Sequence, residues 1–230
     1  MNGCNNSCVL FFIKHPVKGR VKTRLAAALG TDAVVELYRN FVLDTLSTLQ
    51  QLNVPFRICY YPGSAEAKLI DWLGPQYSYM AQRGADLGRR MKNAFLKTFD
   101  DNFRKVVIIG SDSPDLPADF ITRAFDALDS NGAVIGPCAD GGYYLIGFSH
   151  DHFLPEAFDN IPWSTDSVFK QTVDVLNRNK CRLHTLPRWY DVDTPADLKE
   201  LLERNRNTDF CKSKTLTCLM QMEGKNGFQT

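Results

Sequence analysis

The chain carries almost no net charge and no long apolar run, and each absence excludes a class of protein. With 27 basic and 26 acidic residues, the formal net charge is +1, so its overall charge does not favour non-specific binding to nucleic acid or membranes. No stretch reaches the roughly 20 apolar residues that span a bilayer, and no segment reads as a signal peptide. We therefore expect a cytoplasmic protein with no membrane span and no nucleic acid partner.

Paired cysteines and several catalytic signatures are also missing. The seven cysteines form no C-x-x-C pair, so neither a zinc site nor a disulfide framework is predicted. Cys59, Cys138 and Cys181 lie in apolar runs, where a reduced thiol packs as a small core residue. No G-x-S-x-G or G-x-G-x-x-G occurs, and Val21 stands where a P-loop needs its second glycine.

What the chain does have is a dense basic loop directly after an apolar strand. Residues 9–13 read as a buried strand, and 25–29 are apolar and helix-competent. Between them lie a proline, a glycine and five cations without an acid: Lys14, Pro16, Lys18, Gly19, Arg20, Lys22 and Arg24. A helix N-terminus with cationic side chains binds phosphate groups. Because the rest of the chain is nearly neutral, this loop predicts a small anionic ligand.

Apolar runs alternate with helical patterns along residues 7–204, without an internal repeat or linker. This alternation predicts one doubly wound α/β sheet in a single domain over residues 1–204. We expect helices to begin near Thr31, at Asp86, at Ser164 or Thr165, and at Thr194-Pro195. The tail, 205–230, is either loosely held or docked on the body or a second subunit.

Acidic residues follow two of the predicted strands. Asp112 comes directly after the apolar run 106–109, and Asp193 follows the last strand. Ligands of open α/β sheets bind beyond the carboxyl ends of the strands, and Mg²⁺ prefers one or two carboxylates together with phosphate oxygens. We expect Asp112 and Asp193 to hold the metal at the same site as Lys22. Asp191 is a weaker candidate ligand, and Asp115 either joins them or caps the next helix.

Two further groups of polar and glycine residues precede predicted elements. Gln82 and the segment 84–88 stand before a helix. We assign Gln82, Gly84 and Gly88 to contact with a base or phosphate of the ligand, although an ordinary helix cap explains the segment equally well. The second group contains the adjacent glycines Gly141 and Gly142, which stand before a predicted strand. Paired glycines allow a ligand to approach the backbone closely, although a hairpin turn explains them equally well. We assign the residues of this second group to binding a second substrate, the acceptor of a transferred group. These residues are Asp140, Gly141, Gly142, Trp163 and Ser164.

Together these segments resemble a known family. The blocks that carry the resemblance are Lys14–Leu25 (KHPVKGRVKTRL), Gly84–Gly88 (GADLG), Gly110–Leu116 (GSDSPDL), Asp140–Gly147 (DGGYYLIG) and Trp163–Thr165 (WST). They look like those of bacterial glycosyltransferase-A-fold proteins in the nucleotide-diphospho-sugar transferase superfamily. That family is related to the 2-phospholactate and molybdenum-cofactor guanylyltransferases.

The resemblance implies a three-layer α/β/α sandwich with a mixed, mostly parallel sheet of about seven strands and a divalent ion, Mg²⁺ or Mn²⁺, at the nucleotide phosphates. Asp112 falls where the superfamily keeps a metal-binding aspartate. Residues 191–198 (DVDTPADL) are similar to the V-D-T-P-E-D-L ending of sugar-acid cytidylyltransferases, which supports Asp193. The chain departs from the sugar nucleotidyltransferases in its first loop, which is rich in Lys and Arg rather than glycine.

Three hypotheses for the activity remain open. In the first, a nucleoside triphosphate is attacked at its α-phosphorus by a phosphate or hydroxyl acceptor and releases pyrophosphate. Lys18, Lys22 and Arg24 then neutralise the triphosphate, and Lys22, Arg24 and Asp112 are the catalytic residues. In the second, a glycosyl group is transferred from a nucleotide-diphospho-sugar on the same metal. In the third, the protein binds a nucleotide without turnover. A homodimer is compatible with each.

Overall fold

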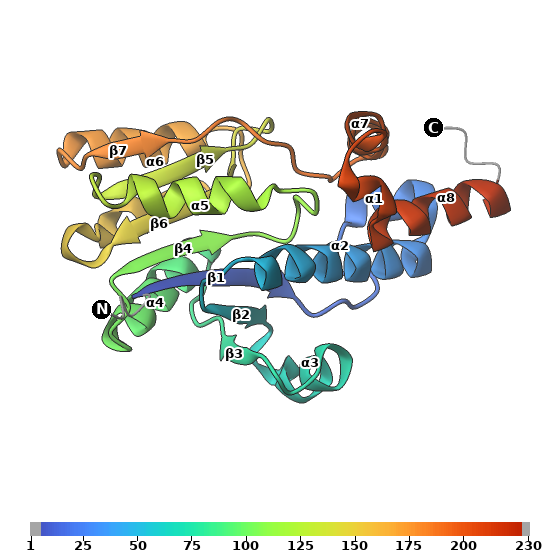
Figure 1. The fold of residues 1–230 in the computed structure, drawn as a ribbon, viewed down its shortest axis with the longest axis horizontal. Coiled ribbons are helices and arrows are strands. Elements are labelled where there is room, and N and C mark those ends of the chain that lie inside the picture. The colour runs from blue at the N-terminus through green and yellow to red at the C-terminus, as the bar shows by residue number, and fades with distance from the viewer. Residues whose placement is uncertain (1–5, 227–230) are drawn as a thin grey trace. The chain divides into compact units, whose positions relative to one another are not determined.

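The computed structural model describes residues 6–226, and the side chains of 223–226 are not described. The chain divides into two compact units, each described here by itself. Unit 1 comprises Met1–His15, Leu52–Gly110 and Pro117–Trp189, and unit 2 comprises Pro16–Gln51, Ser111–Leu116 and Tyr190–Thr230. Figure 1 shows the elements of both units in the colours of the chain order.

All seven strands belong to unit 1. They are β1 (Ser7–Lys14), β2 (Phe56–Tyr61), β3 (Ser78–Ala81), β4 (Lys105–Ile109), β5 (Ala133–Pro137), β6 (Tyr143–Ser149) and β7 (Leu183–Thr185). Its helices are η1 (Gly63–Ala65), α3 (Glu66–Leu73), α4 (Leu87–Asp100), α5 (Ala118–Ala127), η2 (His150–His152), η3 (Pro155–Phe158) and α6 (Val168–Arg178). The helices of unit 2 are α1 (Thr23–Leu29), α2 (Thr31–Gln51), α7 (Pro195–Asn205), η4 (Asp209–Lys212) and α8 (Lys214–Asn226).

The strands form one sheet in the order β3-β2-β1-β4-β6-β5-β7. The pairs β1–β2, β1–β4, β2–β3 and β5–β7 are parallel, and β6 runs antiparallel to both β4 and β5. Residues 8–13 of β1 and 106–109 of β4 are continuous apolar runs and are all buried, as expected of central strands that are covered on both faces. This confirms the predicted α/β fold with a mixed, mostly parallel sheet of seven strands.

Helices cover both faces of the sheet in unit 1, so the unit has three layers (Figure 1). On one face, α4, α6 and η3 bury an aromatic-rich core in which Phe95 packs against Phe148 and Phe158. Helix α5 lies on the opposite face, against β4 and β5. The amphipathic pattern of α4 explains its position, since Met91, Phe95 and its other buried residues form one stripe.

Unit 2 has an apolar core of its own, built from helices that lie far apart in the sequence. Leu25 of α1, Phe41 of α2 and Leu198 of α7 are buried together with Leu216 and Leu219 of α8. The N-terminus of α8 is capped by Asp44, whose carboxylate accepts hydrogen bonds from the backbone N–H groups of residues 214 and 215 at 3.0 and 2.8 Å. Within unit 2, part of the tail is therefore docked on α2.

Two expectations about helix starts need correction or refinement. Helix α6 begins at Val168, three or four residues later than predicted. Ser164 has a left-handed backbone with φ of 70°, and the Thr165 hydroxyl donates back to the carbonyl of Pro162, so this segment forms a turn. Thr31 is the first residue of α2 itself. The predicted cap at Asp86 is confirmed, because its carboxylate accepts the backbone N–H of Arg89 at 2.8 Å.

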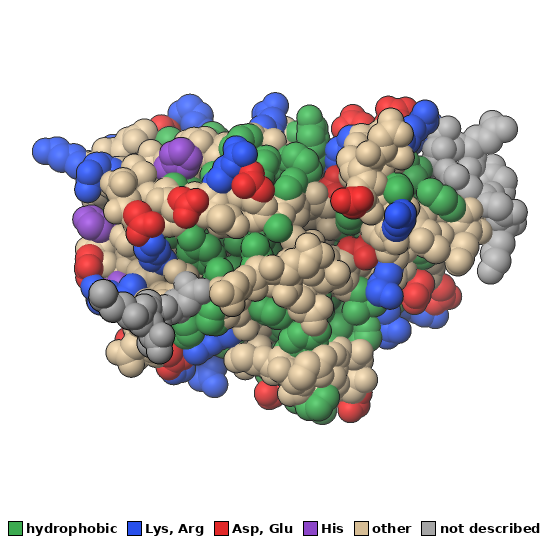
Figure 2. Space-filling model, viewed as in Figure 1, with side chains coloured by type: hydrophobic (Ala, Val, Ile, Leu, Met, Phe, Trp, Pro, Cys, Tyr) green, Lys and Arg blue, Asp and Glu red, His purple; other side chains and the backbone are tan. Residues whose placement is uncertain are grey.

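The surface carries both signs of charge. On the face drawn in Figure 2, basic and acidic side chains lie interspersed, in keeping with the nearly balanced composition. Among the described residues, no helix combines the length and the apolar character that crossing a membrane requires.

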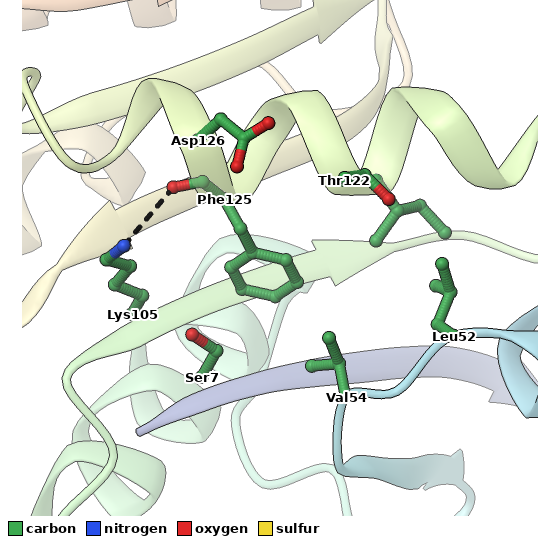
Figure 3. Close-up of a pocket in the computed structure, with 8 residues that line it drawn as sticks. Ser7, Leu52, Val54, Lys105, Thr122, Phe125 and Asp126 are labelled. Atoms are coloured by element: carbon green, nitrogen blue, oxygen red, sulfur yellow. Dashed lines mark hydrogen bonds between the residues drawn. The ribbon is translucent and has the colours of Figure 1, made fainter. Parts of the chain in front are cut away.

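Unit 1 also contains a small pocket at the amino ends of β1 and β4 (Figure 3). Ser7 and Lys105, which begin these paired strands, line it. Its other lining residues are Leu52, Val54, Ile121, Thr122, Phe125 and Asp126. The Lys105 ammonium donates to the carbonyl of Phe125 and pairs with Asp129. The pocket therefore lies at the amino ends of these strands, whereas ligands of α/β proteins bind beyond the carboxyl ends.

Candidate metal and phosphate site

Unit 2 brings three of the predicted site residues into direct contact. The Lys22 ammonium lies 2.5 Å from Oδ1 of Asp112 and 2.8 Å from Oδ1 of Asp193. Only 4% of the Lys22 side chain is exposed. Burial by itself would lower the pKa of Lys22, but the two carboxylates outweigh it and raise the pKa to about 12. The lysine is therefore a permanent positive charge held between two acids.

Local backbone geometry places Lys22 in this position. It is the residue before α1 and has a left-handed backbone, with φ of 44° and ψ of 49°. Its carbonyl accepts the N–H of Ala26, so the chain turns directly from the basic loop into the helix. The ammonium also lies 5.7 Å from the centroid of the Phe41 ring on α2, a distance at which a cation and an aromatic face attract one another.

The loop that carries Asp112, Ser111–Leu116, is held by hydrogen bonds on either side of this residue. The hydroxyls of Ser111 and Tyr38 are 2.9 Å apart, and the N–H of Val192 donates to the carbonyl of Asp112 at 2.9 Å. Val192 is fully buried and precedes Asp193. This backbone bond therefore places the two aspartates side by side.

Asp115 has a role that neither sequence interpretation foresaw. Only 1% of its side chain is exposed, and its carboxylate accepts Nε and Nη2 of Arg204 at 2.7 and 3.0 Å. Nδ2 of Asn205 donates to the same carboxylate at 2.7 Å. Asp115 therefore ties the Asp112 loop to the end of α7, whereas the N-cap of α5 is Pro117. The partners are 89 and 90 residues away in sequence, and no local pattern signals the pairing.

A capping box fixes the position of Asp193. Asp197 accepts the backbone N–H groups of Asp193 and Thr194 at 2.9 and 2.7 Å. The Thr194 hydroxyl in turn accepts the N–H of Asp197, and Pro195 occupies the first turn of α7. This is the arrangement that stabilises a helix N-terminus. The capping box holds the backbone of Asp193, and the Asp193 side chain contacts Lys22.

The donor set of this cluster fits a hard divalent cation. Asp112 is 54% exposed and Asp193 37% exposed, so each carboxylate is accessible to solvent although one of its oxygens contacts Lys22. Two neighbouring carboxylates that remain open to water match the preference of Mg²⁺ for few protein ligands, phosphate oxygens and water.

The other basic-loop residues are more exposed than Lys22. Lys18 pairs with Asp32 at the start of α2, and both side chains are well exposed. Arg20 and Arg24 are exposed, and no ion pair to either is found among the side chains that the structure describes. Gly19 has φ of 72°, a turn conformation that glycine adopts without strain. Lys14, the last residue of β1, belongs to unit 1.

The predicted nucleotide residues of unit 1 have structural partners. Gln82 is buried, and its side-chain N–H₂ donates to the carbonyls of Ile13 and Cys59 at 3.2 and 2.8 Å. Its amide therefore joins the carboxyl ends of β1 and β2. Gly84 has φ of 148°, and its carbonyl accepts Nε of Arg90. A Cβ at Gly88 would lie 2.5 Å from the Trp163 ring, so only glycine allows this contact.

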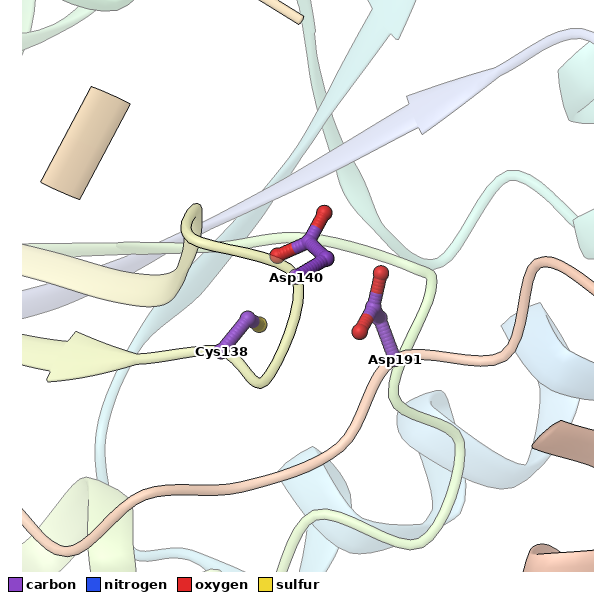
Figure 4. Close-up of side chains that lie close together, drawn as sticks. All are labelled: Cys138, Asp140 and Asp191. Atoms are coloured by element: carbon purple, nitrogen blue, oxygen red, sulfur yellow. The ribbon is translucent and has the colours of Figure 1, made fainter. Parts of the chain in front are cut away.

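The residues assigned to the acceptor also lie in unit 1. Asp140 accepts the N–H of Gly142 at 2.8 Å, and a Cβ at Gly141 would lie 2.0 Å from the carbonyl oxygen of Asp166. Figure 4 shows Asp140 and Cys138 on the loop after β5, and Asp191 on the segment before α7 in unit 2. Trp163 meets the Tyr143 ring edge to face. Roles in acceptor binding for these residues, and in metal binding for Asp191, stay predictions.

Comparison with solved structures confirms the fold. A candidate nucleotide-diphospho-sugar transferase from Desulfovibrio desulfuricans G20 is 45% identical, with 96% of each chain covered and a TM-score of 0.93. A CMP:2-keto-3-deoxy-manno-octonic acid synthetase complexed with CTP is 9% identical, with 87% of this chain and 98% of that chain covered and a TM-score of 0.51. Rv0371c from Mycobacterium tuberculosis H37Rv, in complex with manganese, is 16% identical, with 86% and 97% covered and a TM-score of 0.51.

These neighbours share the fold of nucleotide-diphospho-sugar transferases. None of the curated proteins matches the chain. A relation to the 2-phospholactate and molybdenum-cofactor guanylyltransferases stays a prediction. A family model with the description "Uncharacterized protein conserved in bacteria (DUF2064)" matches residues 44–165, more than half of the chain. The chain therefore belongs to the DUF2064 family.

Proposed function

We propose that the protein is a metal-dependent nucleotidyltransferase. It would take a nucleoside triphosphate, join the nucleotidyl group to a small phosphate or hydroxyl acceptor, and release pyrophosphate. The single observation that carries the proposal is the Lys22–Asp112–Asp193 cluster of unit 2. Two carboxylates and a buried cation, next to a loop of exposed cations, suit an ion bound to polyphosphate. The CTP and manganese in the two distant structural neighbours agree with this choice.

The residues of the cluster would act by position and charge. Asp112 and Asp193 would hold Mg²⁺ or Mn²⁺, which supplies charge neutralisation at the phosphates. Lys22 would reach a phosphate oxygen, while Lys18, Arg20 and Arg24 would bring further positive charge to the loop. Such preorganised charges stabilise the negative charge that develops in the transition state of phosphoryl transfer. Lys14, Gly19, Gln82, Gly84 and Gly88 remain proposed nucleotide contacts.

Pyrophosphate release tests the proposal directly. The protein is incubated with each of the four nucleoside triphosphates, Mg²⁺ or Mn²⁺, and a panel of phosphorylated and hydroxylated acceptors. We expect release that depends on both the metal and an acceptor. Asp112→Asn or Asp193→Asn should lower the rate roughly ten- to a thousandfold, the loss expected for one charge contact. The matched control is Asp119→Asn, which removes an exposed carboxylate paired with Arg123 on α5.

Glycosyl transfer is the second candidate, because the 45% identical relative is described as a candidate nucleotide-diphospho-sugar transferase. In that reaction an acceptor hydroxyl attacks the sugar carbon, and a nucleoside diphosphate leaves. Release of nucleoside diphosphate from a nucleotide-sugar, without pyrophosphate release from any triphosphate, would decide for it. Nucleotide binding that survives Asp112→Asn, without turnover of either donor class by the unsubstituted protein, would instead identify a non-catalytic nucleotide-binding protein.

A further inference from the structure

We propose that Lys22 is a built-in cation that competes with the divalent ion for Asp112 and Asp193. In this view the ammonium occupies the position between the carboxylates when no ion is bound, and gives up at least one of them when the ion binds. The inference rests on the proposed function in one respect only, which is that it assigns the ion to the same two carboxylates. It goes further by making Lys22 an inhibitor of metal binding in the free protein.

The contacts of Lys22 carry this argument. Its Nζ lies 2.5 and 2.8 Å from one oxygen of each carboxylate, and these are the lengths of charge-assisted hydrogen bonds. The side chain is almost fully buried, so the ammonium has little access to water. A divalent cation that coordinated the same oxygens would be brought close to a second positive charge. Because like charges at such short range repel one another, the two cations exclude one another at these oxygens.

Displacing Lys22 without a new partner would be costly. A buried ammonium that loses its carboxylates is left uncompensated, which is the most unfavourable outcome for a buried ion pair. Phosphate oxygens of a nucleotide would provide the replacement partner, since the neighbouring loop is already cationic. Binding of the ion and of the phosphates should therefore strengthen one another, and this coupling is necessarily reciprocal. The free protein should bind divalent ions weakly by itself.

Binding of Mn²⁺ alone, without nucleotide, tests the competition. The affinity of the unsubstituted protein is compared with that of Lys22→Met, which removes the charge and keeps the apolar stem, by electron paramagnetic resonance of free Mn²⁺. We expect Lys22→Met to bind Mn²⁺ roughly 10- to 100-fold more tightly, the worth of one charge-assisted contact. Mn²⁺ should also raise the thermal midpoint of this variant more than that of the unsubstituted protein, because the ion binds only the folded state.

Two controls separate the competition from general effects. Lys92→Met removes another lysine–aspartate pair, that of Lys92 with Asp159 in unit 1, and should leave Mn²⁺ affinity unchanged. Adding Asp112→Asn to Lys22→Met should abolish the gain. If Lys22→Met folds only in the presence of Mn²⁺, that result supports the inference. If it does not fold at all, Lys22→Gln, which is neutral but still donates N–H groups, replaces it in the same comparison.

The outcomes distinguish this inference from the proposed function. Equal or weaker Mn²⁺ binding by the neutral Lys22 variants would overturn the competition, even if the unsubstituted protein released pyrophosphate from a triphosphate. Tighter Mn²⁺ binding by Lys22→Met would support the competition, even if no triphosphate were turned over by the unsubstituted protein.

Discussion

Replacing Asp115 by Asn should destabilise the protein well beyond what a surface substitution does. The carboxylate is buried, accepts two N–H groups of Arg204 and one of Asn205, and is the only acid paired with this guanidinium among the described side chains. Nη1 of Arg204 is already buried and has no hydrogen-bond partner among the residues that the structure describes. Losing the charge therefore leaves an uncompensated, partly buried cation.

The expected magnitude follows from the burial of the pair. Removing one partner of a buried ion pair costs about 3–5 kcal/mol. Because Arg204 keeps some solvent contact and stacks on the Tyr190 ring at 4.9 Å, we expect a loss of about 2–4 kcal/mol in the free energy of unfolding. In urea the unfolding midpoint should fall by roughly 1 M or more. Asp119→Asn, which breaks an exposed aspartate–arginine pair on α5, should cost about 0.5 kcal/mol or less.

A double variant tests whether the uncompensated charge is the cause. Asp115→Asn combined with Arg204→Met removes both charges and keeps an amide oxygen for Asn205. Its loss of stability should be at least about 1 kcal/mol smaller than the sum of the single losses, since the two residues are in contact. Full additivity of the two substitutions, or a loss for Asp115→Asn no greater than that for Asp119→Asn, would refute the reasoning.

Three further predictions concern other parts of the two units. Gly141→Ala should lower the free energy of unfolding in urea by about 2 kcal/mol or more, because φ is 89° and the new Cβ would collide with the backbone of Asp166. The control is Gly19→Ala, at a residue with a similar φ but no atom near the new Cβ, which should cost about 1 kcal/mol. Asp101→Asn should lower stability at neutral pH by about 0.5–1 kcal/mol. Hydrogen bonds from Lys97 and Arg57 depress the pKa of Asp101, so this contribution is present above the unfolded pKa of about 4 and is lost as the pH falls through the lower folded value. A stability difference that stays constant between pH 6 and pH 2 would contradict this. Asp44→Ala should cost about 1–2 kcal/mol, as for other lost helix caps, and should speed amide exchange first in α8; unchanged exchange over residues 214–222 would contradict it.

Much of the fold could be predicted from local patterns in the sequence. Continuous apolar runs identified the central strands β1 and β4, because a strand that is buried on both faces needs apolar residues throughout. Residues with strong capping chemistry, Asp86 and Thr194-Pro195, located the starts of α4 and α7 correctly. The turn at Ser164 was predicted wrongly as a helix start. Its backbone is left-handed, and a serine gives no signal of that conformation in the sequence.

The candidate site was predictable in its residue types but not in its contacts. A basic loop after one strand and aspartates after two others were visible in the sequence, and the carboxyl-end rule indicated that they meet. The degree of burial of Lys22 was not visible, and neither was its simultaneous contact with both aspartates. The tethering of the Asp112 loop by Arg204 and Asn205 was equally hidden.

The sequence by itself determined which short segments become strands, helices and caps, and which of their ends carry charge, because these features depend on neighbours a few residues away. Tertiary structure alone decided how the charges of the candidate site are paired and which of them stay open to solvent. Lys22 and Asp193 are 171 residues apart in the chain, and only the packing of α1, α2 and α7 around one apolar core brings them within a hydrogen bond of each other. The same packing removes water from Lys22 but not from Arg24. The strength of such a long-range ion pair depends on distance and burial, and the packing of the helices sets both.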